Sequence, residues 1–243
     1  MKLKVVTYNM HKGKSFWFRD YRLNVIREQI QKLEPEIVFL QEAPGVHPKS
    51  ASYLLDPVEY FADQTWPHHC YGKNAVYDGG HHGNAIISKY TIDNHINHDI
   101  SQTRLAKRGL LHAQVNIKES GRESLIHLLN VHLDLTAKAR RLQTQFILNY
   151  VKSHLDSNDR IILAGDFNDW QGRLDADFRT MFDRELVEKN QRGQKTFPAL
   201  KPIYDLDRVY TRNLSASGVH VPREGAWKSL SDHLPLCVDV DLA

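Results

Sequence analysis

Short apolar runs that end in polar residues recur along this chain of 243 residues. Residues 5–8 lead to Asn9, and residues 161–164 lead to Gly165-Asp166. Other runs are followed or preceded by Glu42, His132, Asp207 and Asp232-His233. A short apolar run bounded by polar residues is typical of a buried strand. Because rigid scaffolds hold reactive groups in loops and at strand ends, we expect one rim of the fold to gather these side chains.

The same pattern predicts the fold class. Helices are expected over residues 20–33, before Pro35, and over residues 136–155. Strands are expected at residues 3–8, 37–40, 85–88, 110–117, 125–131, 161–163, 206–210, 219–221 and 234–240, with a glycine-containing loop just before residues 85–88. Strands outnumber helices, and neighbouring strands interrupt any strict alternation of strand and helix. This favours an α/β (α+β) fold with mixed sheets. Since no linker-like stretch divides the chain, we expect one domain over residues 1–243.

Composition narrows the classes of protein that fit. Hydrophobic residues make up 41% of the chain and charged residues 25%, which is ordinary for a globular protein. The net charge of +3 suits an anionic substrate but is too small to indicate nucleic acid by itself. Cys70 and Cys237 are expected to be free thiols in a reducing compartment. No apolar run has signal-peptide or membrane-spanning length, so we expect a cytoplasmic protein without a transmembrane segment; peripheral membrane association stays open.

Several of the polar residues suit the binding of a metal ion and a phosphate group. Glu42 and Asp232 offer hard carboxylate oxygens of the kind that magnesium and manganese prefer. A bound metal of this kind neutralises phosphate oxygens and lowers the pKa of water. Asn9 and Asn168 can donate neutral hydrogen bonds to phosphate oxygens. Taken alone, Glu42 would equally be a solvated loop carboxylate.

Other polar residues suit proton transfer. A histidine oriented by a carboxylate, as His233 would be by Asp207, can polarise water or stabilise a transition state. Asp166 is a candidate for the base itself. The structural alternatives are an Asx turn or helix N-cap formed by Asp166 and Asn168, and a surface ion pair of Asp207 with Arg208.

Seven segments of the chain occur in the order found in the endonuclease/exonuclease/phosphatase superfamily, which the chain resembles. The segments are Thr7-Tyr8-Asn9, Leu40-Gln41-Glu42, Gly83-Asn84-Ala85-Ile86, Asn130-Val131-His132-Leu133, Gly165-Asp166-Phe167-Asn168, Leu206-Asp207-Arg208-Val209 and Ser231-Asp232-His233. That superfamily includes pancreatic-type deoxyribonuclease, apurinic endonucleases, inositol polyphosphate phosphatases and neutral sphingomyelinases. The resemblance implies a four-layer sandwich, in which two mixed β-sheets pack face to face with helices outside.

The resemblance also implies a role for each residue. Glu42 is the expected principal ligand of Mg²⁺, or of Mn²⁺, with Asp232 as a further ligand. The expected catalytic residues are Asn9 for binding phosphate or supporting the metal shell, Asp166 and Asn168 for activating or positioning the nucleophile, His132 and His233 for flanking the scissile phosphate, and Asp207 for orienting His233. A core histidine is the alternative for His132.

Two departures separate the chain from the apurinic endonucleases. Those enzymes carry an aspartate two residues after the first asparagine, where this chain has His11. They also carry a tyrosine-asparagine pair in place of the His132 segment. Both differences point away from abasic-site repair. Because position 11 is a histidine rather than an aspartate, the sequence does not support a second metal ligand near Asn9. His11-Lys12-Gly13 instead resembles a bacterial subgroup of the superfamily.

Residues that would bind the substrate are indicated less sharply. The family often has a phosphate-binding tyrosine in the segment before residues 85–88, and Tyr77 is the candidate there, with Tyr71 and core packing as alternatives. Arg108 belongs to a basic cluster, with its neighbours at positions 104 and 107, that would face phosphate or lie in a solvated loop.

Aromatic residues and paired histidines complete the candidates. Trp227 would stack on a base, insert toward lipid or pack in the core. Phe16-Trp17-Phe18 would line an apolar rim around the site or pack in the core. His68-His69 and His81-His82 lack partners at metal-site spacing, and we interpret them as loop histidines near the active rim.

The sequence therefore predicts a magnesium-dependent hydrolase of phosphate esters, with a phosphodiesterase as the first choice and in-line attack by activated water. The weak net charge and the absence of a long basic insertion do not favour a nuclease. Nucleic acid, phospholipid and inositol phosphate stay open as substrates. A non-catalytic scaffold of the same fold is disfavoured, because none of the motif residues is missing.

Overall fold

The computed structural model describes residues 1–13, 22–45, 57–62, 65–78, 80–104, 106–119, 121–184 and 193–242. The strands of the described part are β1 (Lys2–Asn9), β2 (Ile37–Pro44), β3 (His68–Tyr77), β4 (Gly80–Ser88), β5 (Ile92–Asp99), β6 (Gly109–Glu119), β7 (Arg122–His132), β8 (Arg160–Asp166), β9 (Asp183–Arg184), β10 (Asp207–Arg212), β11 (Ser215–His220) and β12 (Leu236–Asp241). Its α-helices are α1 (Leu23–Gln31), α2 (Pro57–Phe61), α3 (Ala137–His154), α4 (Asp175–Phe178) and α5 (Trp227–Leu230), and a 3-10 turn, η1 (His11–Gly13), follows β1.

The strands form two six-stranded mixed sheets. The first has the order β11-β12-β1-β2-β4-β3, and the second has the order β5-β6-β7-β8-β10-β9. Each sheet has one parallel pair at its centre, β1 with β2 and β7 with β8, whereas its other neighbours are antiparallel. Parallel strands need a crossover connection, and α1 and α3 lie in the two crossovers.

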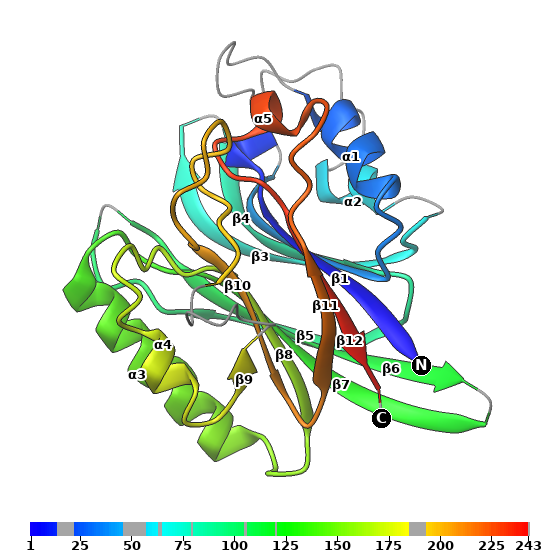
Figure 1. Cartoon of the computed structure of the whole chain (residues 1–243). Coiled ribbons are helices and arrows are strands. Elements are labelled where there is room, and N and C mark those ends of the chain that lie inside the picture. Colours follow the sequence, from blue (N-terminus) through cyan, green and yellow to red (C-terminus); the bar gives the residue numbers. More distant parts are fainter. Residues whose placement is uncertain are drawn as a thin grey trace.

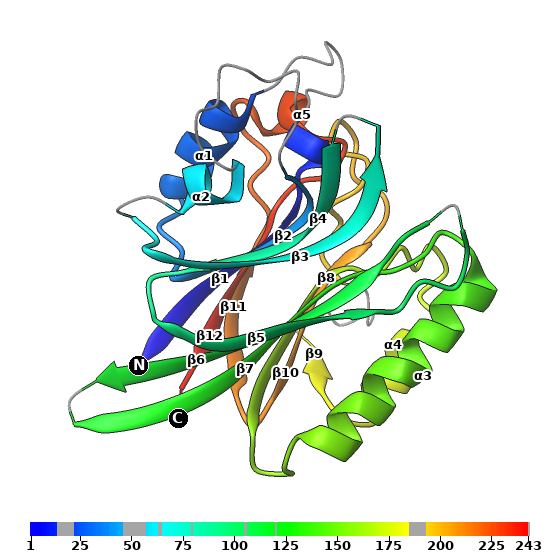
Figure 2. The ribbon, with the colours of Figure 1, turned by 180° about the vertical axis from the view of Figure 1, so that it is seen from behind.

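The two sheets pack face to face, and the helices lie outside them (Figure 1). α1, α2 and α5 lie on the side of the first sheet, and α3 and α4 cover the second, an arrangement that is also seen from behind (Figure 2). One buried apolar cluster joins the sheets and includes Phe39 of β2 and Leu128 of β7. A second cluster includes Ile147 of α3 and Leu163 of β8. The predicted four-layer sandwich is confirmed.

This topology brings chemically important residues to one rim. In the parallel pairs, Asn9 lies opposite Gln41, and His132 lies opposite Asp166. β10 runs antiparallel to β8 and begins at Asp207, which pairs with Asp166. Because the carboxyl ends of adjacent parallel strands meet at the same edge of a sheet, residues far apart in sequence gather at one end of the sandwich.

The long helix α3 has nearly the predicted bounds. Its N-cap is Thr136, whose hydroxyl accepts a hydrogen bond from the Ala139 backbone N–H at 3.4 Å and so satisfies one N–H group of the first turn. Leu142 and Phe146 are 42% and 38% exposed, so the face that they share is not the buried one. Ile147 is among the residues that α3 buries instead. Among the described residues, no helix is long and apolar enough to cross a membrane.

The apolar pattern does not predict three of the strands, which are β3, β5 and the two-residue β9. β3 and β5 lie at edges of their sheets, and their burial patterns are mostly exposed or intermediate. An edge strand with little buried surface carries few apolar residues, so the periodic signal is weak. The loop expected just before residues 85–88 is wrong, because residues 80–83 begin β4. β2 also continues to Pro44, so Gln41 and Glu42 lie within the strand.

Candidate active site

The buried carboxylate of Asp166 lies at the centre of this rim. Its Oδ2 accepts a hydrogen bond from Asn9 Nδ2 at 3.0 Å, and it faces His132 Nε2 at 3.4 Å and His233 Nε2 at 3.6 Å. All four residues are at least 96% buried. Four predicted catalytic residues therefore meet around one oxygen, although they come from β1, β7, β8 and the segment before β12.

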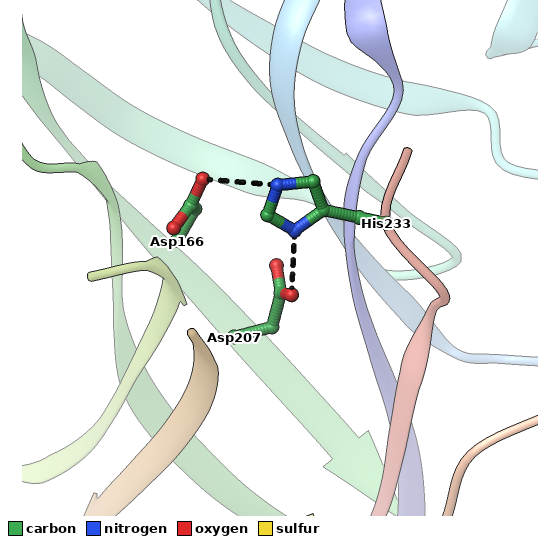
Figure 3. Close-up of side chains that lie close together, drawn as sticks. All are labelled: Asp166, Asp207 and His233. Carbon is green, nitrogen blue, oxygen red and sulfur yellow. Dashed lines mark hydrogen bonds and ion pairs between the residues drawn. The ribbon is translucent and has the colours of Figure 1, made fainter. Parts of the chain in front are cut away.

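The imidazole of His233 bridges two carboxylates (Figure 3). Its Nδ1 lies 2.8 Å from Asp207 Oδ2, and its Nε2 faces Asp166. Asp207 is fully buried, and the same Oδ2 accepts a hydrogen bond from Thr196 Oγ1. Since Asp207 holds the Nδ1 side of the ring, Nε2 is directed toward Asp166.

The hydroxyl of Ser231 ties the segment before β12 to the end of β1. It donates a hydrogen bond to the Asn9 carbonyl at 2.7 Å and accepts one from the His233 backbone N–H at 3.2 Å. Ser231 is fully buried. These bonds fix the backbone of His233 relative to Asn9, which gives the serine of Ser231-Asp232-His233 a physical role.

Two unusual backbone conformations shape the turn at the end of β8. Gly165 has a φ of 148°, and a Cβ at this position would lie 1.9 Å from the Val131 carbonyl oxygen, so glycine allows β8 to pass close to β7. Asn168 has a φ of 49°, a left-handed conformation that asparagine tolerates better than most residues. Its backbone N–H donates to Asp166 Oδ1 at 2.9 Å, and its Nδ2 donates to the Leu133 carbonyl at 2.9 Å. The Asx turn is present, and it leaves Asp166 Oδ2 facing the site.

Burial and neighbouring charges set different protonation states within the site. Burial raises the pKa of Asp166 to about 6, although the positive charge of His233 opposes the rise. Burial lowers the pKa of His233, but the charges of Asp207 and Asp166 outweigh this and raise the pKa to about 10. Burial, with the positive charges of Arg108 and His233, holds the pKa of His132 well below its ordinary value. Near pH 7 the site therefore combines an imidazolium, a neutral imidazole and a carboxylate able to take up a proton.

Glu42 and Asp232 present two more carboxylates at the rim. Glu42 lies in a β-bulge where β2 shifts its register against β4, and its φ is 51°. A bulge re-aims the side chain that it carries; the Glu42 side chain is 19% exposed, and its Oε2 lies 4.0 Å from Lys12 Nζ. The Asp232 side chain is 23% exposed, and its Oδ1 lies 3.2 Å from His11 Nδ1.

The donor atoms of these carboxylates fit a hard divalent cation. The hydrogen bond to Asp232 is the main reason that the pKa of His11 is raised, and the charge of Glu42 adds to the rise. Both carboxylates therefore act on His11. Burial raises the pKa of Asp232, but the hydrogen bond from His11 and the positive charges of His233 and His11 together lower it below its ordinary value, so this carboxyl group stays ionised. Glu42 and Asp232, with the side-chain oxygen of Asn9 at the end of the adjacent strand, are the residues that could hold such a cation.

A second set of potential metal ligands is less suitable. Asp166, Asp207 and His233 offer ligand atoms within 4.8 Å of one another. However, each ring nitrogen of His233 faces a carboxylate. A histidine protonated on both nitrogens has no lone pair to give to a metal, so this set is better suited to holding a proton.

The two predicted substrate-binding residues, Tyr77 and Arg108, are placed as follows. Tyr77 is 42% exposed at the end of β3, with its ring centre 5.8 Å from that of His82. Arg108 is half-buried, and its Nε donates to a backbone carbonyl of the β7–α3 loop at 3.1 Å. The alternative residue, Tyr71, has its hydroxyl 2.9 Å from His81 Nδ1. The charge of Glu42 also contributes to a raised pKa of Tyr77, after burial.

Other sequence-based interpretations need correction. Trp227 is 4% exposed at the start of α5 and packs edge-on against Tyr8, with ring centres 5.6 Å apart. Stacking on a base and insertion into lipid are therefore wrong for Trp227. His68-His69 lie at the beginning of β3, where His68 pairs with Ser88, at the end of β4 that lies away from Glu42; their expected place near the rim is wrong. Phe16-Trp17-Phe18 lie outside the described residues.

Three residues next to the site escape the sequence reasoning. Thr196 hydrogen-bonds Asp207, and the ring centre of Phe197 lies 4.8 Å from that of His233. The ring of Trp170 meets Phe197 edge-on at 5.2 Å. Their segments lie outside regular helices and strands, so no periodic pattern marks them. Only the position of Trp170, two residues after Asn168, offers a signal in the sequence.

Comparisons with known proteins identify the family and the fold of this chain. The sequence model of the Endonuclease/Exonuclease/phosphatase family matches residues 6–233. The chain is 35% identical to the Uncharacterized protein YbhP of Escherichia coli K12 over 246 aligned positions, which cover 98% of this chain and 96% of that protein. The crystal structure of an endonuclease/exonuclease/phosphatase from Beutenbergia cavernae superposes with a TM-score of 0.78 at 19% identity, covering 100% of this chain and 72% of that one. TDP2 from D. rerio, in complex with a single-strand DNA product, superposes with a TM-score of 0.70 at 17% identity, covering 99% of each chain.

The chain belongs to the endonuclease/exonuclease/phosphatase family. Members of this family are in general metal-dependent hydrolases of phosphoester bonds. The solved structures are less than 25% identical to this chain, and what they share with it is the fold. The substrates of those proteins are not carried over to this chain.

Proposed function

We propose that this protein is a magnesium-dependent phosphodiesterase. The observation that carries the proposal is the meeting of Asn9, His132 and His233 around one oxygen of Asp166. A buried carboxylate with a raised pKa, beside an imidazolium and a neutral imidazole, is suited to general acid–base chemistry at phosphorus.

Asp166 is the proposed base. Its Oδ2 takes the proton of the attacking water, and the Asn9 amide, which bonds the same oxygen, keeps that oxygen directed into the site. A base whose pKa lies near 6 accepts a proton readily at neutral pH. Asn168 supports this role indirectly, since its backbone N–H holds the other oxygen of the carboxylate.

His233 and His132 are proposed to flank the scissile phosphate. His233 stays positively charged because Asp207 balances its charge, so it stabilises the negative charge that develops on phosphate oxygens. His132 is neutral and donates a hydrogen bond without trapping the anionic product. Tyr77 and Arg108 are proposed to contact the substrate at the outer part of the rim.

Glu42 and Asp232 are proposed to hold the Mg²⁺ ion, with Mn²⁺ as an alternative. When bound, such an ion neutralises charge on the phosphate and lowers the pKa of water. The bulge of β2 directs the Glu42 carboxylate, and the hydrogen bond from His11 helps to lower the pKa of Asp232. These two features support the assignment.

An aromatic surface beside His233 supports a substrate that carries a planar ring. Trp170 is 38% exposed and is packed edge-on by Phe197 and Tyr204, at 5.2 and 5.0 Å. A cavity of about 390 Å³ opens beside it and is lined by Trp170, Tyr204 and Lys195, among others. Aromatic surfaces next to a phosphate site suit bases of single-stranded nucleic acid, so a nuclease is the second candidate function. Phospholipid and inositol phosphate are the remaining alternatives.

Two cysteines support a reducing compartment such as the cytoplasm. Cys70 and Cys237 are both free and buried, and proteins of oxidising compartments more often pair their cysteines.

The test is an activity panel on the full chain with Mg²⁺, with Mn²⁺ and with a chelator. The substrates are bis(p-nitrophenyl) phosphate, single-stranded DNA, RNA, phosphatidylcholine and an inositol phosphate. We expect hydrolysis of the synthetic diester with either metal, and none with the chelator. Glu42→Gln should lower kcat/KM by roughly 10²–10³, as expected for loss of a group that acts in the transition state.

Glu36→Gln is the matched control. Glu36 immediately precedes β2, whereas Glu42 lies near its end, and Glu36 forms a surface ion pair with Lys89 at 3.0 Å. This variant should keep full activity. Undiminished hydrolysis by Glu42→Gln, or in the presence of the chelator, would refute the proposed mechanism.

A further inference from the structure

A layer of buried polar side chains lies directly beneath the site and has no part in the proposed chemistry. Its members are Thr7, Gln41, Asn84 and Asn130, all at least 99% buried. Each lies on a strand of the central sandwich, and three of them come one or two residues before a residue of the site: Thr7 before Asn9, Gln41 before Glu42 and Asn130 before His132. Buried amides are costly unless they are hydrogen-bonded, so their partners show what the layer holds together.

Asn130 makes hydrogen bonds from the second sheet to the first. Its Nδ2 donates to the carbonyl oxygens of Leu40 at 3.0 Å and Ala85 at 2.8 Å. Its Oδ1 accepts from Gln41 Nε2 at 2.8 Å. In the opposite direction, Asn84 Nδ2 of the first sheet donates to the Asn130 carbonyl at 3.2 Å. The two sheets are thus pinned to each other by reciprocal amide bonds.

These bonds fall at the point where β2 leaves regular pairing. Leu40 pairs with Ala85 immediately before the register shift, and the next pair is Ala43 with Gly83. Glu42 lies inside this shift in a left-handed conformation. A non-glycine residue in such a conformation persists only where its surroundings hold it. Asn130 bonds both residues of the last regular pair, so it is a contact from the opposite sheet that holds the backbone where the bulge begins.

Asn130 also lies on the same strand as His132, which is proposed to flank the scissile phosphate. It lies two residues before His132 on β7, and side chains two apart in a strand point to the same face. One residue therefore connects the bulge that carries Glu42 with the strand end that carries His132.

We propose that Asn130 is a positioning residue, which sets the place of the metal-binding carboxylate Glu42 relative to His132. The inference rests on the proposed function, since it assigns Glu42 to the metal. Outer partners that orient metal ligands typically contribute about 10–100-fold to metal affinity or activity. Asn130→Ala removes the donors to two buried carbonyls and the acceptor for Gln41 in one step.

The test measures Mn²⁺ binding by electron paramagnetic resonance on the full chain without substrate, followed by kcat and KM for bis(p-nitrophenyl) phosphate. The wild-type protein is measured first and should bind Mn²⁺. Glu42→Gln should abolish that binding. Asn130→Ala should weaken Mn²⁺ binding by about 10–100-fold and lower kcat more than it raises KM.

Ile126→Ala separates positioning from loss of stability. Ile126 lies on the same strand, is fully buried and belongs to the cluster between the sheets, but makes no side-chain hydrogen bond. It should lower the melting temperature at least as much as Asn130→Ala and keep Mn²⁺ affinity close to that of the wild type. If Asn130→Ala does not fold, Gln41→Met takes its place, because it removes one bond to Asn130 and keeps the side-chain size.

The outcomes are distinguishable. Equal Mn²⁺ affinities in the wild type and the Asn130→Ala or Gln41→Met variant would overturn the positioning role while leaving the proposed function intact. The positioning role would also be overturned if Asn130→Ala and Ile126→Ala have equal melting temperatures and lose Mn²⁺ affinity and kcat to the same extent. A wild type that neither binds Mn²⁺ nor hydrolyses the diester would overturn the proposed function and this inference together.

Discussion

His233 Nδ1 lies 2.8 Å from Asp207 Oδ2, and both side chains are at least 95% buried. This pair controls the charge of His233, because Asp207 is the largest of the influences that raise its pKa. Without the Asp207 carboxylate, the burial of His233 would favour its neutral ring.

Asp207→Asn should therefore inactivate the enzyme without removing the ring of His233. The pKa of His233 should fall, and the amide would also favour the wrong tautomer. We expect kcat/KM to drop by about 10²–10⁴, with the descending limb of the pH–rate profile moved to lower pH. Asp239→Asn, in a surface ion pair with Lys2 at 3.9 Å, is the control and should behave as the wild type. An active Asp207→Asn enzyme with an unchanged profile would contradict the pairing.

The bond from Asn9 to Asp166 should be visible in the ascending limb of the same profile. Asp166 must be ionised to act as a base, so activity should rise with pH through its pKa, which burial raises to about 6. The Asn9 bond lowers that pKa. Asn9→Ala should consequently shift the limb to higher pH, besides lowering kcat. Measurements at saturating Mg²⁺ would show this, with the exposed Asn94→Ala as control; a limb that stays in place or moves to lower pH would argue against Asp166 as the base.

The aromatic surface should affect substrate binding more than chemistry. Trp170→Ala should raise KM for single-stranded DNA by about tenfold, because stacking on an aromatic side chain contributes roughly 1–3 kcal/mol per base. Values of kcat should change little. Phe146→Ala is matched in exposure, since both residues are 38% exposed, and it lies on α3. If Trp170→Ala and Phe146→Ala have the same KM for ring-bearing substrates, the aromatic surface does not bind them.

A hydrogen-bonded chain on the second sheet should make the fold sensitive to acid. His112 Nδ1 lies 2.8 Å from the Tyr150 hydroxyl, and its Nε2 lies 2.9 Å from His127 Nδ1. Burial, with the nearby charge of His127, lowers the pKa of His112 to about 4 from an ordinary 6.5. The unfolded chain binds the proton more readily between these values, so stability contributed by neutral His112 is lost as the pH falls from 6.5 toward 4.

Urea unfolding at pH 7 and pH 5 measures this effect. We expect the part due to His112 to be about 2 kcal/mol of unfolding free energy. His112→Gln should therefore lose less stability between the two pH values than the wild type, whereas the exposed His95→Gln should follow the wild type. The same loss in all three proteins would exclude His112 as the acid-sensitive group.

Much of the fold follows from local patterns in the sequence. α3 begins after an N-cap at Thr136, close to the predicted start of the helix, and strands with strongly apolar cores such as β2 and β8 occur where the apolar runs predict them. β3 and β5 do not, because edge strands bury little surface and so need few apolar residues. Leu142 and Phe146 of α3 are 42% and 38% exposed, so apolar residues at helical spacing need not face the core.

The sequence by itself determined which chemical groups this protein can use and the order in which they occur. The resemblance to a family depends on those groups and on their order. Only the tertiary structure decided how those groups meet. Asn9 and Asp166 are 157 positions apart, and their bond exists because two parallel strand pairs end at one rim. The charge of His233, the neutrality of His132 and the bonds of Asn130 across the sheets depend on burial and on distances between segments remote in sequence, and these arise only when the two sheets pack.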